Sequence, residues 1–400
     1  MTVRERNLKS VTARSSGRVR VAWLHTAIPS YRVPFLQRLA ERSELEVDCF
    51  HGEGREGYNV TSVGRELPTG SVWVRNIFWP FGGGRVLWQT AFWKIVRGRY
   101  DVVVCSESVH NMTVWALRLA QAWAGFRLVL IGYGYRPETF QGRLSPLRDS
   151  ARMDLIRAAD AILVYTERGR QTLLDEGVEP EKLFNYSNTL DTEMLMNHAA
   201  NVDPGTVTSL RQRYGLEQGR TLLYVGRLAP VKQVPSLLAA VRQLNERGTA
   251  CQLLVIGEGH ESEALRASAS DLPNVHFLGA IYDERELAHY FMTADLLVMP
   301  GRVGLTCVHG FAYGVPVVTS RHDVEQSPEF DYVDSGYNGV IVDKPEAELY
   351  AQTVEALLAD KARLAQLSRG ALQTAETLSM RNMVEQFSAA MTYSARVVTG

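Results

Sequence analysis

The chain of 400 residues contains no apolar run of about 18 residues, and no apolar segment follows its charged N-terminus. Neither a membrane span nor a signal peptide is therefore expected. Lys plus Arg (43) almost balances Asp plus Glu (44), so no excess of charge indicates a nucleic acid or a strongly acidic partner.

The cysteines are few and far apart, without the close spacing of a zinc site or a disulfide framework. All four lie in apolar stretches, so we expect reduced core residues and a cytoplasmic protein. They are Cys49, Cys105, Cys251 and Cys307.

Length and periodicity indicate two α/β domains. A chain of this length with 46% hydrophobic residues is too long for one ordinary core. Residues 1–17 are polar and predict a disordered leader. Short β-rich runs then alternate with amphipathic segments up to residue 200, at 19–24, 45–50, 101–105, 127–131 and 161–165. This alternation predicts a parallel sheet wrapped by helices.

A second series of the same kind follows a polar stretch with turn-forming residues near residues 201–205. Its strands are expected at 221–225, 251–256, 275–278, 296–299 and 315–319. We therefore expect Rossmann-like domains at 18–200 and 206–378, with a helix at 379–400 packing back on the first. Two such sheets facing each other bind ligands at the carboxyl ends of their strands, in the deep cleft between the domains.

Two cations follow the first strand of the second domain. Gly226 ends the strand and permits close backbone approach, and Arg227 offers a planar fork of donors. Five residues later Lys232, which we expect on the following helix, adds a compact charge. This arrangement suits phosphate oxygens. A strand-end turn with two solvated basic side chains is the alternative.

Two further glycine-bearing strand ends occur in this domain. Gly257-Glu258-Gly259 is by itself as typical of a tight strand-to-helix turn as of a nucleotide site. Gly304 is expected to open a short helix whose first free amides, near Leu305 and Thr306, attract anions. His309 follows one turn later, within reach of a group at the helix start, although a lone histidine is also an ordinary core or helix-surface residue.

These elements occur in the order and spacing of the retaining bacterial glycosyltransferases that use nucleotide sugars (family 4-like, group 1), which the chain resembles from about 221 to 342. The shared motifs are Gly-Arg-Leu-x-x-x-Lys at 226–232, Gly-x-Gly at 257–259, Val-x-Phe-x-Gly at 275–279, Ala-Asp-x-x-x-x-Pro at 294–300 and Ala-x-Gly-x-Pro-Val at 312–317. The first domain matches more loosely, at 31–35 and 159–166.

The resemblance implies the GT-B fold, with a donor-binding second domain and an acceptor-binding first domain. Arg227 and Lys232 would hold the diphosphate of a nucleotide sugar, assisted by the helix start at 304–306. Backbone near Leu278 and Gly279 would meet the base. On the acceptor side the residues are Tyr31, Arg32 and Tyr133. The sugar would be transferred with retention to a sugar or lipid-linked acceptor, without cofactor or metal, in agreement with the absence of Asp-x-Asp from the chain.

The sequence departs from the family at three positions. Gly301 and His309 replace two glutamates, one beside the donor sugar and one accepting the ribose hydroxyls. His309 can still hydrogen-bond a ribose hydroxyl, whereas the sugar-side carboxylate is missing. Tyr133 stands where a histidine is frequent. A phenol there can donate to a phosphate or sugar oxygen, or it is simply a buried strand-end tyrosine.

Two other functions remain open on this sequence. The missing glutamates are compatible with a protein that binds a nucleotide sugar without turnover. A sugar-nucleotide epimerase shares the expected architecture but requires acid and base side chains around the sugar, and no carboxylate pair is evident there.

Residues 73–100, which hold four of the seven tryptophans, suit either a buried core segment or a contact with a membrane. A helix over 86–97 would carry a broad apolar arc, and the preceding loop contains Trp79, Phe81 and Arg85. This arc either packs on the first sheet or enters the interface of the inner membrane. Residues 1–20 carry six Lys or Arg against one Glu, which favours anionic lipid.

Overall fold

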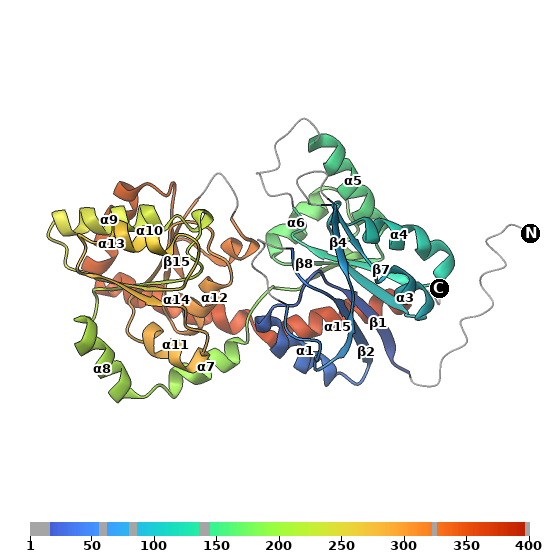
Figure 1. The fold of residues 1–400 in the computed structure, drawn as a ribbon, viewed down its shortest axis with the longest axis horizontal. Helices are drawn as coiled ribbons and strands as arrows, with labels where there is room; N and C mark the ends of the chain where they lie inside the picture. Colours follow the sequence, from blue (N-terminus) through green and yellow to red (C-terminus); the bar gives the residue numbers. More distant parts are fainter. Residues whose placement is uncertain (1–16, 56–61, 80–85, 136–144, 322–325, 397–400) are drawn as a thin grey trace, which may run out of the picture.

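The computed structural model describes residues 17–55, 62–79, 86–135, 145–321 and 326–396, which form two α/β domains side by side (Figure 1). Each domain is built around a parallel sheet, and the predicted architecture of two Rossmann-like domains is confirmed.

The first sheet has seven strands in the order β3-β2-β1-β6-β7-β8-β9. The chain builds outward from β1 on one side and then crosses to β6, so the strand order reverses between β1 and β6. Ligands bind outside such a switch point in open α/β sheets. In chain order the strands are β1 (Val19–Leu24), β2 (Leu45–His51), β3 (Gly70–Trp73), β6 (Val102–Ser106), β7 (Arg127–Gly132), β8 (Ala161–Val164) and β9 (Leu183–Asn185).

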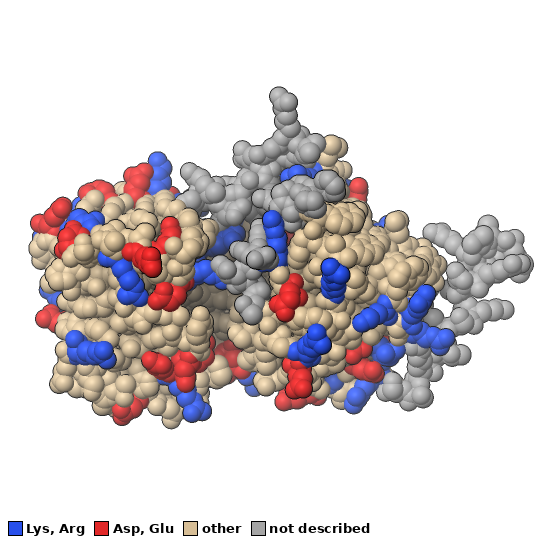
Figure 2. Space-filling model, viewed as in Figure 1, with Lys and Arg blue, Asp and Glu red and all other residues tan. Residues whose placement is uncertain are grey.

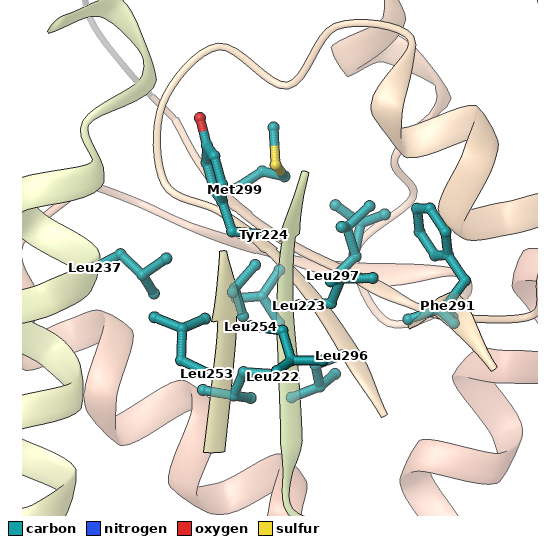
Figure 3. Packing of buried hydrophobic residues seen from close by; sticks show 14 of the residues in the cluster. Leu222, Leu223, Tyr224, Leu237, Leu253, Leu254, Phe291, Leu296, Leu297 and Met299 are labelled. Atoms are coloured by element: carbon teal, nitrogen blue, oxygen red, sulfur yellow. The ribbon is translucent and has the colours of Figure 1, made fainter. Parts of the chain in front are cut away.

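The second sheet has six strands in the order β12-β11-β10-β13-β14-β15, with its switch point between β10 and β13. Its central strands are buried on both faces, as the apolar runs predict (Figure 3). The strands are β10 (Thr221–Val225), β11 (Gln252–Ile256), β12 (Val275–Gly279), β13 (Leu296–Met299), β14 (Val317–Ser320) and β15 (Gly339–Val342).

Helices cover both faces of both sheets. The first domain carries α1 (Val33–Ala40), α3 (Phe92–Arg97), α4 (Met112–Ala124), α5 (Ser145–Ala158) and α6 (Glu167–Asp175). The second carries α7 (Thr192–Ala200), α8 (Pro204–Tyr214), α9 (Val234–Glu246), α10 (Ser262–Ser268), α11 (Glu284–Phe291), α12 (Thr306–Ala312), α13 (Ala347–Ala359) and α14 (Lys361–Thr377). Short 3-10 turns are η1 (Ser30–Arg32), η2 (Pro180–Lys182), η3 (Pro230–Lys232) and η4 (Pro328–Tyr332).

The last helix, α15 (Met380–Arg396), leaves the second domain and packs on the first (Figure 1). Together with α1 it covers one face of the first sheet. Phe387 is fully buried there, with its ring centroid 4.8 Å from that of Trp23 and 5.7 Å from that of Phe35. Residues near the two ends of the sequence therefore pack in the same hydrophobic core.

The chain crosses between the domains twice, and the two crossings touch. The first crossing precedes Thr192 rather than lying near residue 200, because α7 packs on α11 and α12 of the second domain. Thr189 and Thr192 both donate hydrogen bonds to the Leu378 carbonyl, at 2.8 and 3.3 Å. The polar residues at 201–205 form the start of α8, where Asp203 caps the helix, instead of a linker.

The tryptophan-rich segment differs from the expected helix. Val86–Gln89 is strand β5, paired antiparallel with β4 (Asn76–Trp79), and the helix is limited to α3. The spacing of the apolar residues fits a helix as well as a strand, and the hydrogen-bonded pairing with β4 stabilises the strand. Leu87, Ala91 and Ile95 are buried in the core, while Phe81 and Arg85 lie outside the described residues. No helix among the described residues is long and apolar enough to cross a membrane.

We predict that α15 is an essential part of the first domain. Phe387→Ala should lower the free energy of unfolding by about 3–5 kcal/mol, since it leaves a cavity beside Trp23. Urea denaturation followed by tryptophan fluorescence measures this change. Glu385→Ala, at an exposed position of the same helix, is the control. Equal midpoints for the two variants would contradict the prediction.

Candidate functional site

The loops after β10 and β13 flank the switch point of the second sheet and carry the predicted cations. Gly226 and Arg227 follow β10 directly, and Arg227 is exposed. Lys232 was expected on the following helix, but it ends η3, before α9 begins. In the space-filling view, basic side chains lie beside the hollow between the two domains (Figure 2).

Lys232 is held where the two loops meet. Its ammonium donates a hydrogen bond of 2.6 Å to the Arg302 carbonyl, and a Cβ on Gly304 would lie 3.7 Å from Nζ. Burial, together with the positive charges of Arg302 and Arg227, lowers the pKa of Lys232 to about 8, and the negative charge of Glu329 opposes this shift. The surroundings of this ammonium therefore supply too little negative charge, and a bound anion would correct this.

The start of α12 lies next to Lys232. The amides of Val303 and Gly304 donate to Gln326 Oε1 (3.0 Å) and Ser327 Oγ (2.8 Å). The next two amides, of Leu305 and Thr306, have no acceptor among the described residues. Gly304 takes a positive φ of 61°, which turns the chain into the helix. The cation and the two free amides thus share one side of the switch point.

The Gly-x-Gly element has a packing role at the ends of β10 and β11. A Cβ on Gly257 would lie 1.9 Å from the Gly226 carbonyl oxygen, and one on Gly259 would lie 2.1 Å from that of Leu228. These contacts require glycine, because any side chain would collide with backbone. The element therefore shapes the loop that carries Arg227.

The predicted base-binding residues lie at the neighbouring ends of β11 and β12. The Gly257 amide donates to the Gly279 carbonyl at 2.7 Å, and Leu278 is partly buried against the core. Glu258 is exposed and pairs with Arg266 at 3.2 Å. A Cβ on Gly279 would lie 3.5 Å from Glu258 Oε1, so these residues surround one edge of the sheet.

His309 is paired with a carboxylate that the sequence did not indicate. Its Nε2 lies 3.2 and 3.1 Å from the two carboxylate oxygens of Glu284, at the start of α11. The imidazole stacks on Phe291 with an interplanar angle of 8°, and its buried Nδ1 has no hydrogen-bond partner within the described ranges. Glu284 is partly exposed, so this pair presents a carboxylate to solvent.

Gly301 leaves no room for the glutamate that the family has there. A Cβ at this position would lie 2.3 Å from the Val231 carbonyl oxygen and 2.5 Å from the Lys232 carbonyl carbon. The close approach brings the two loops together and places Lys232 against the Arg302 carbonyl. Loss of the carboxylate and the position of the lysine are therefore linked.

On the first domain, two neighbouring cavities open at the switch point between β1 and β6. The smaller has a volume of about 240 Å³ and includes Tyr31 and Arg32. The larger, of about 410 Å³, includes Tyr133. Both are lined by Ser106, Ile131 and Tyr165, so the cavities adjoin and bring the three predicted acceptor-side residues to one region.

Arg32 is fixed among aromatic and polar partners. Its Nη2 donates to Asn188 Oδ1 at 2.7 Å and its Nη1 to the Tyr186 hydroxyl at 3.3 Å, and the guanidinium lies over the Tyr31 ring. Tyr165 and Tyr186 lie close by, with ring centroids 6.3 Å apart. The cavity wall is therefore rich in tyrosine.

A hydrogen-bonded relay connects Arg32 to the second domain. Asn188 Nδ2 donates at 2.5 Å to Oε1 of Glu329, a buried carboxylate in η4. Two other residues of η4 also contact the first domain. Asp331 accepts a hydrogen bond from Thr166 at 2.8 Å, and the Tyr332 hydroxyl donates to the Tyr165 carbonyl at 2.7 Å. Glu329 and Asn188 were not predicted, since an acid and an amide far apart in a sequence carry no signal of contact.

Comparison with known proteins gives two family matches. A model described as glycosyl transferases group 1 matches residues 219–360, and a glycosyl transferase 4-like domain matches residues 35–188. These ranges cover most of the second and first domains, respectively.

Relatives and solved structures agree with these matches. The chain is 29% identical to D-inositol 3-phosphate glycosyltransferase 1 of Catenulispora acidiphila, over 61% of this chain and 60% of that protein. It is 32% identical to a GDP-mannose-dependent alpha-(1-6)-phosphatidylinositol monomannoside mannosyltransferase of Mycolicibacterium smegmatis, over 41% of this chain and 45% of that protein. Each match spans less than two thirds of the relative.

The fold is also that of HepE from Anabaena, whose crystal structure contains UDP. The TM-score is 0.67 at 16% sequence identity, over 94% of this chain and 99% of that chain. The two family matches and the shared two-domain fold lead to one conclusion: this chain belongs to the GT-B glycosyltransferases of the group 1, family 4-like type.

Proposed function

We propose that the protein transfers a sugar from a nucleoside-diphosphate sugar to an acceptor hydroxyl, with retention at the anomeric carbon, in the synthesis of a cell-surface polysaccharide or glycolipid. The observation that carries this proposal is the cluster of Lys232, Arg227 and the free amides of Leu305 and Thr306 at the switch point. It is suited to a diphosphate, which has enough charge to match it.

In the proposed reaction the bond between the anomeric carbon and the diphosphate oxygen breaks as the acceptor oxygen bonds to the same face of the sugar. The acceptor proton passes to the departing diphosphate. Negative charge grows on that leaving group, and Arg227 and Lys232 stabilise it more strongly than they stabilise the intact donor. Arg302, whose charge also acts on Lys232, adds to this field. We propose that these cations replace a metal ion.

Two other functions predict different behaviour. A protein that only binds nucleotide sugars would release no nucleoside diphosphate in the presence of any acceptor. An epimerase would convert the donor without an acceptor. The transferase requires both substrates and releases the diphosphate as the sugar moves.

The clamp makes a first testable prediction for this function. Arg227→Ala and Lys232→Ala should each lower kcat/KM by about 30- to 1,000-fold, which corresponds to about 2–4 kcal/mol of transition-state stabilisation. Release of nucleoside diphosphate from UDP- and GDP-sugars is the measurement. Arg242→Ala is the control, because Arg242 pairs with Asp271 on the surface of α9.

The pH dependence gives the same prediction a second readout. The lowered pKa of Lys232, about 8, means that the donor-free lysine loses its charge as the pH rises from 7 to 9. Affinity for UDP or GDP, measured by calorimetry, should therefore fall over this range, and Lys232→Arg should abolish that fall because arginine stays charged. Near wild-type turnover of both alanine variants, or a flat profile of the wild type, would refute the clamp.

We further propose that His309 and Glu284 together receive the ribose hydroxyls of the donor. A neutral imidazole accepts from only one hydroxyl, whereas the paired carboxylate has free lone pairs for a diol. The contact of His309 Nε2 with both oxygens of Glu284 supports a ribose site that the two side chains form together.

The ribose site predicts a loss of nucleotide affinity in His309→Ala, with partial retention in His309→Gln, since glutamine keeps a polar group near Glu284. Calorimetric titration with UDP, GDP and their 2′-deoxy forms measures this effect. Glu263→Gln, at an exposed position of α10, serves as the control. Equal affinity of the wild type for ribo- and 2′-deoxyribonucleotides would rule out the assignment.

A peripheral contact with the inner membrane is also proposed, through the outer faces of α3 and α4. Trp93 on α3 is 56% exposed, and Leu119 and Trp123 on α4 are 72% and 61% exposed. The two helices pack together, at the end of the first domain far from the second (Figure 1). They contain Lys94, Arg97 and Arg118 but no Asp or Glu. This combination of tryptophan, leucine and positive charge fits the interface of an anionic bilayer.

We expect the full chain to co-sediment with vesicles of phosphatidylglycerol and phosphatidylethanolamine, and less so at high salt because screening weakens the attraction. Trp93→Ser with Trp123→Ser should lower the bound fraction several-fold. Tyr282→Ser is the matched control, as Tyr282 is 90% exposed in the second domain. Binding unaffected by the tryptophan changes would refute this surface, and self-association lost in the same variant would identify a second copy of the chain as its partner.

A further inference from the structure

The larger cavity of the first domain is lined by one acidic and one basic side chain that take no part in the proposed reaction. Glu107 follows β6 and Arg152 lies on α5, and both side chains line the cavity of about 410 Å³. This volume falls within the range of about 300–1,000 Å³ that is usual for small-molecule sites.

Glu107 is built into the end of the sheet. Gly132, at the end of β7, leaves space for it, because a Cβ on this glycine would lie 2.1 Å from Glu107 Cγ. Oε1 accepts hydrogen bonds from the amides of Tyr133 (2.8 Å) and Gly134 (3.3 Å). Oε2 is buried and has no hydrogen-bond partner among the described residues. One oxygen of the carboxyl group therefore fixes the loop that carries Tyr133, and the other is available to a ligand.

Arg152 is incompletely satisfied in the same way. Its Nη2 lies 3.6 Å from Glu176 Oε2, which is at most a weak ion pair. Nε and Nη1 are buried, and neither has a hydrogen-bond partner in the part of the chain that the structure describes. Buried donors and acceptors in native proteins are almost always paired, so Arg152 can donate to a ligand in this cavity and Glu107 can accept from one.

The other lining residues define the chemistry of the ligand. Two acidic residues, Glu107 and Asp149, are balanced by Arg148 and Arg152, so the cavity has no excess positive charge for a phosphate. Tyr133 and Tyr165 add aromatic rings with centroids 5.6 Å apart. Sugar hydroxyl groups both donate and accept, and the apolar face of a sugar ring packs on aromatic rings.

We propose that this cavity binds a neutral sugar unit of the acceptor, with a hydroxyl group donating to Glu107 Oε2 and another accepting from Arg152. The inference rests on the proposed transferase function and specifies its acceptor as a saccharide chain or a glycolipid with a sugar head group. The adjoining smaller cavity, where Arg32 connects to the second domain through Asn188 and Glu329, receives the sugar that carries the reacting hydroxyl.

Saturation-transfer NMR on the full chain tests the proposal, with the methyl glycosides of glucose, galactose, mannose and N-acetylglucosamine as probes. At least one glycoside should bind to the wild type. Arg152→Gln and Glu107→Gln should each weaken that binding at least tenfold and leave affinity for UDP or GDP within twofold. Glu107→Gln keeps a carbonyl oxygen for the two amides, so it tests the site without removing the loop's support. Arg170→Gln, on the surface of α6, is the control.

Three results would overturn the proposal: no glycoside binds, Arg152→Gln and Glu107→Gln bind the glycosides as the wild type does, or inorganic phosphate displaces them in an Arg152-dependent manner. The last result would assign an anion site. Failure of the transferase function is distinguishable, since it would appear as loss of nucleotide binding and of donor turnover in the wild type, irrespective of the glycosides.

Discussion

The hydrogen bond between Asn188 and the buried carboxylate of Glu329 joins the two halves of the site. Asn188 holds Arg32 on its other side, and the charge of Glu329 acts on Lys232. An acidic group between Arg32 of the first domain and Lys232 of the second reduces the repulsion between these two cations. Because a buried carboxylate without its partners is costly, the contact between the domains and the placement of Arg32 depend on each other.

Beside this hydrogen bond, the switch point of the second sheet carries an excess of positive charge. The charges of Arg227 and Arg302 both act on Lys232, which is held by a carbonyl oxygen instead of a carboxylate. An isolated lysine in such a place is unfavourable, which is why its pKa is lowered. The proposed diphosphate would remove this penalty. The positive charge that is unfavourable in the free protein would then stabilise the negatively charged leaving group in the complex.

Two of the departures from the family pattern each have a structural explanation at their own position. Gly301 lets the loop after β13 approach the backbone of residues 231–232, at a distance that excludes any side chain. A carboxylate is consequently absent there, while His309 brings in Glu284 from a different helix. The family matches support glycosyl transfer in spite of these changes, whereas the fold alone does not separate transferases from other enzymes that bind nucleotide sugars.

The amino-acid sequence by itself determined the two α/β domains, because buried parallel strands leave apolar runs that alternate with amphipathic helices. It also indicated the cation loop, since Gly226, Arg227 and Lys232 are neighbours in the chain. Local periodicity was insufficient at 86–89, where pairing with β4 makes a strand of a segment that suits a helix equally well. Only the tertiary structure decided the pairs His309–Glu284, Asn188–Glu329 and Glu107 with the Tyr133 loop. Their members are 25, 141 and 26 residues apart, and contacts between different elements depend on how the helices and sheets pack, which no local pattern records.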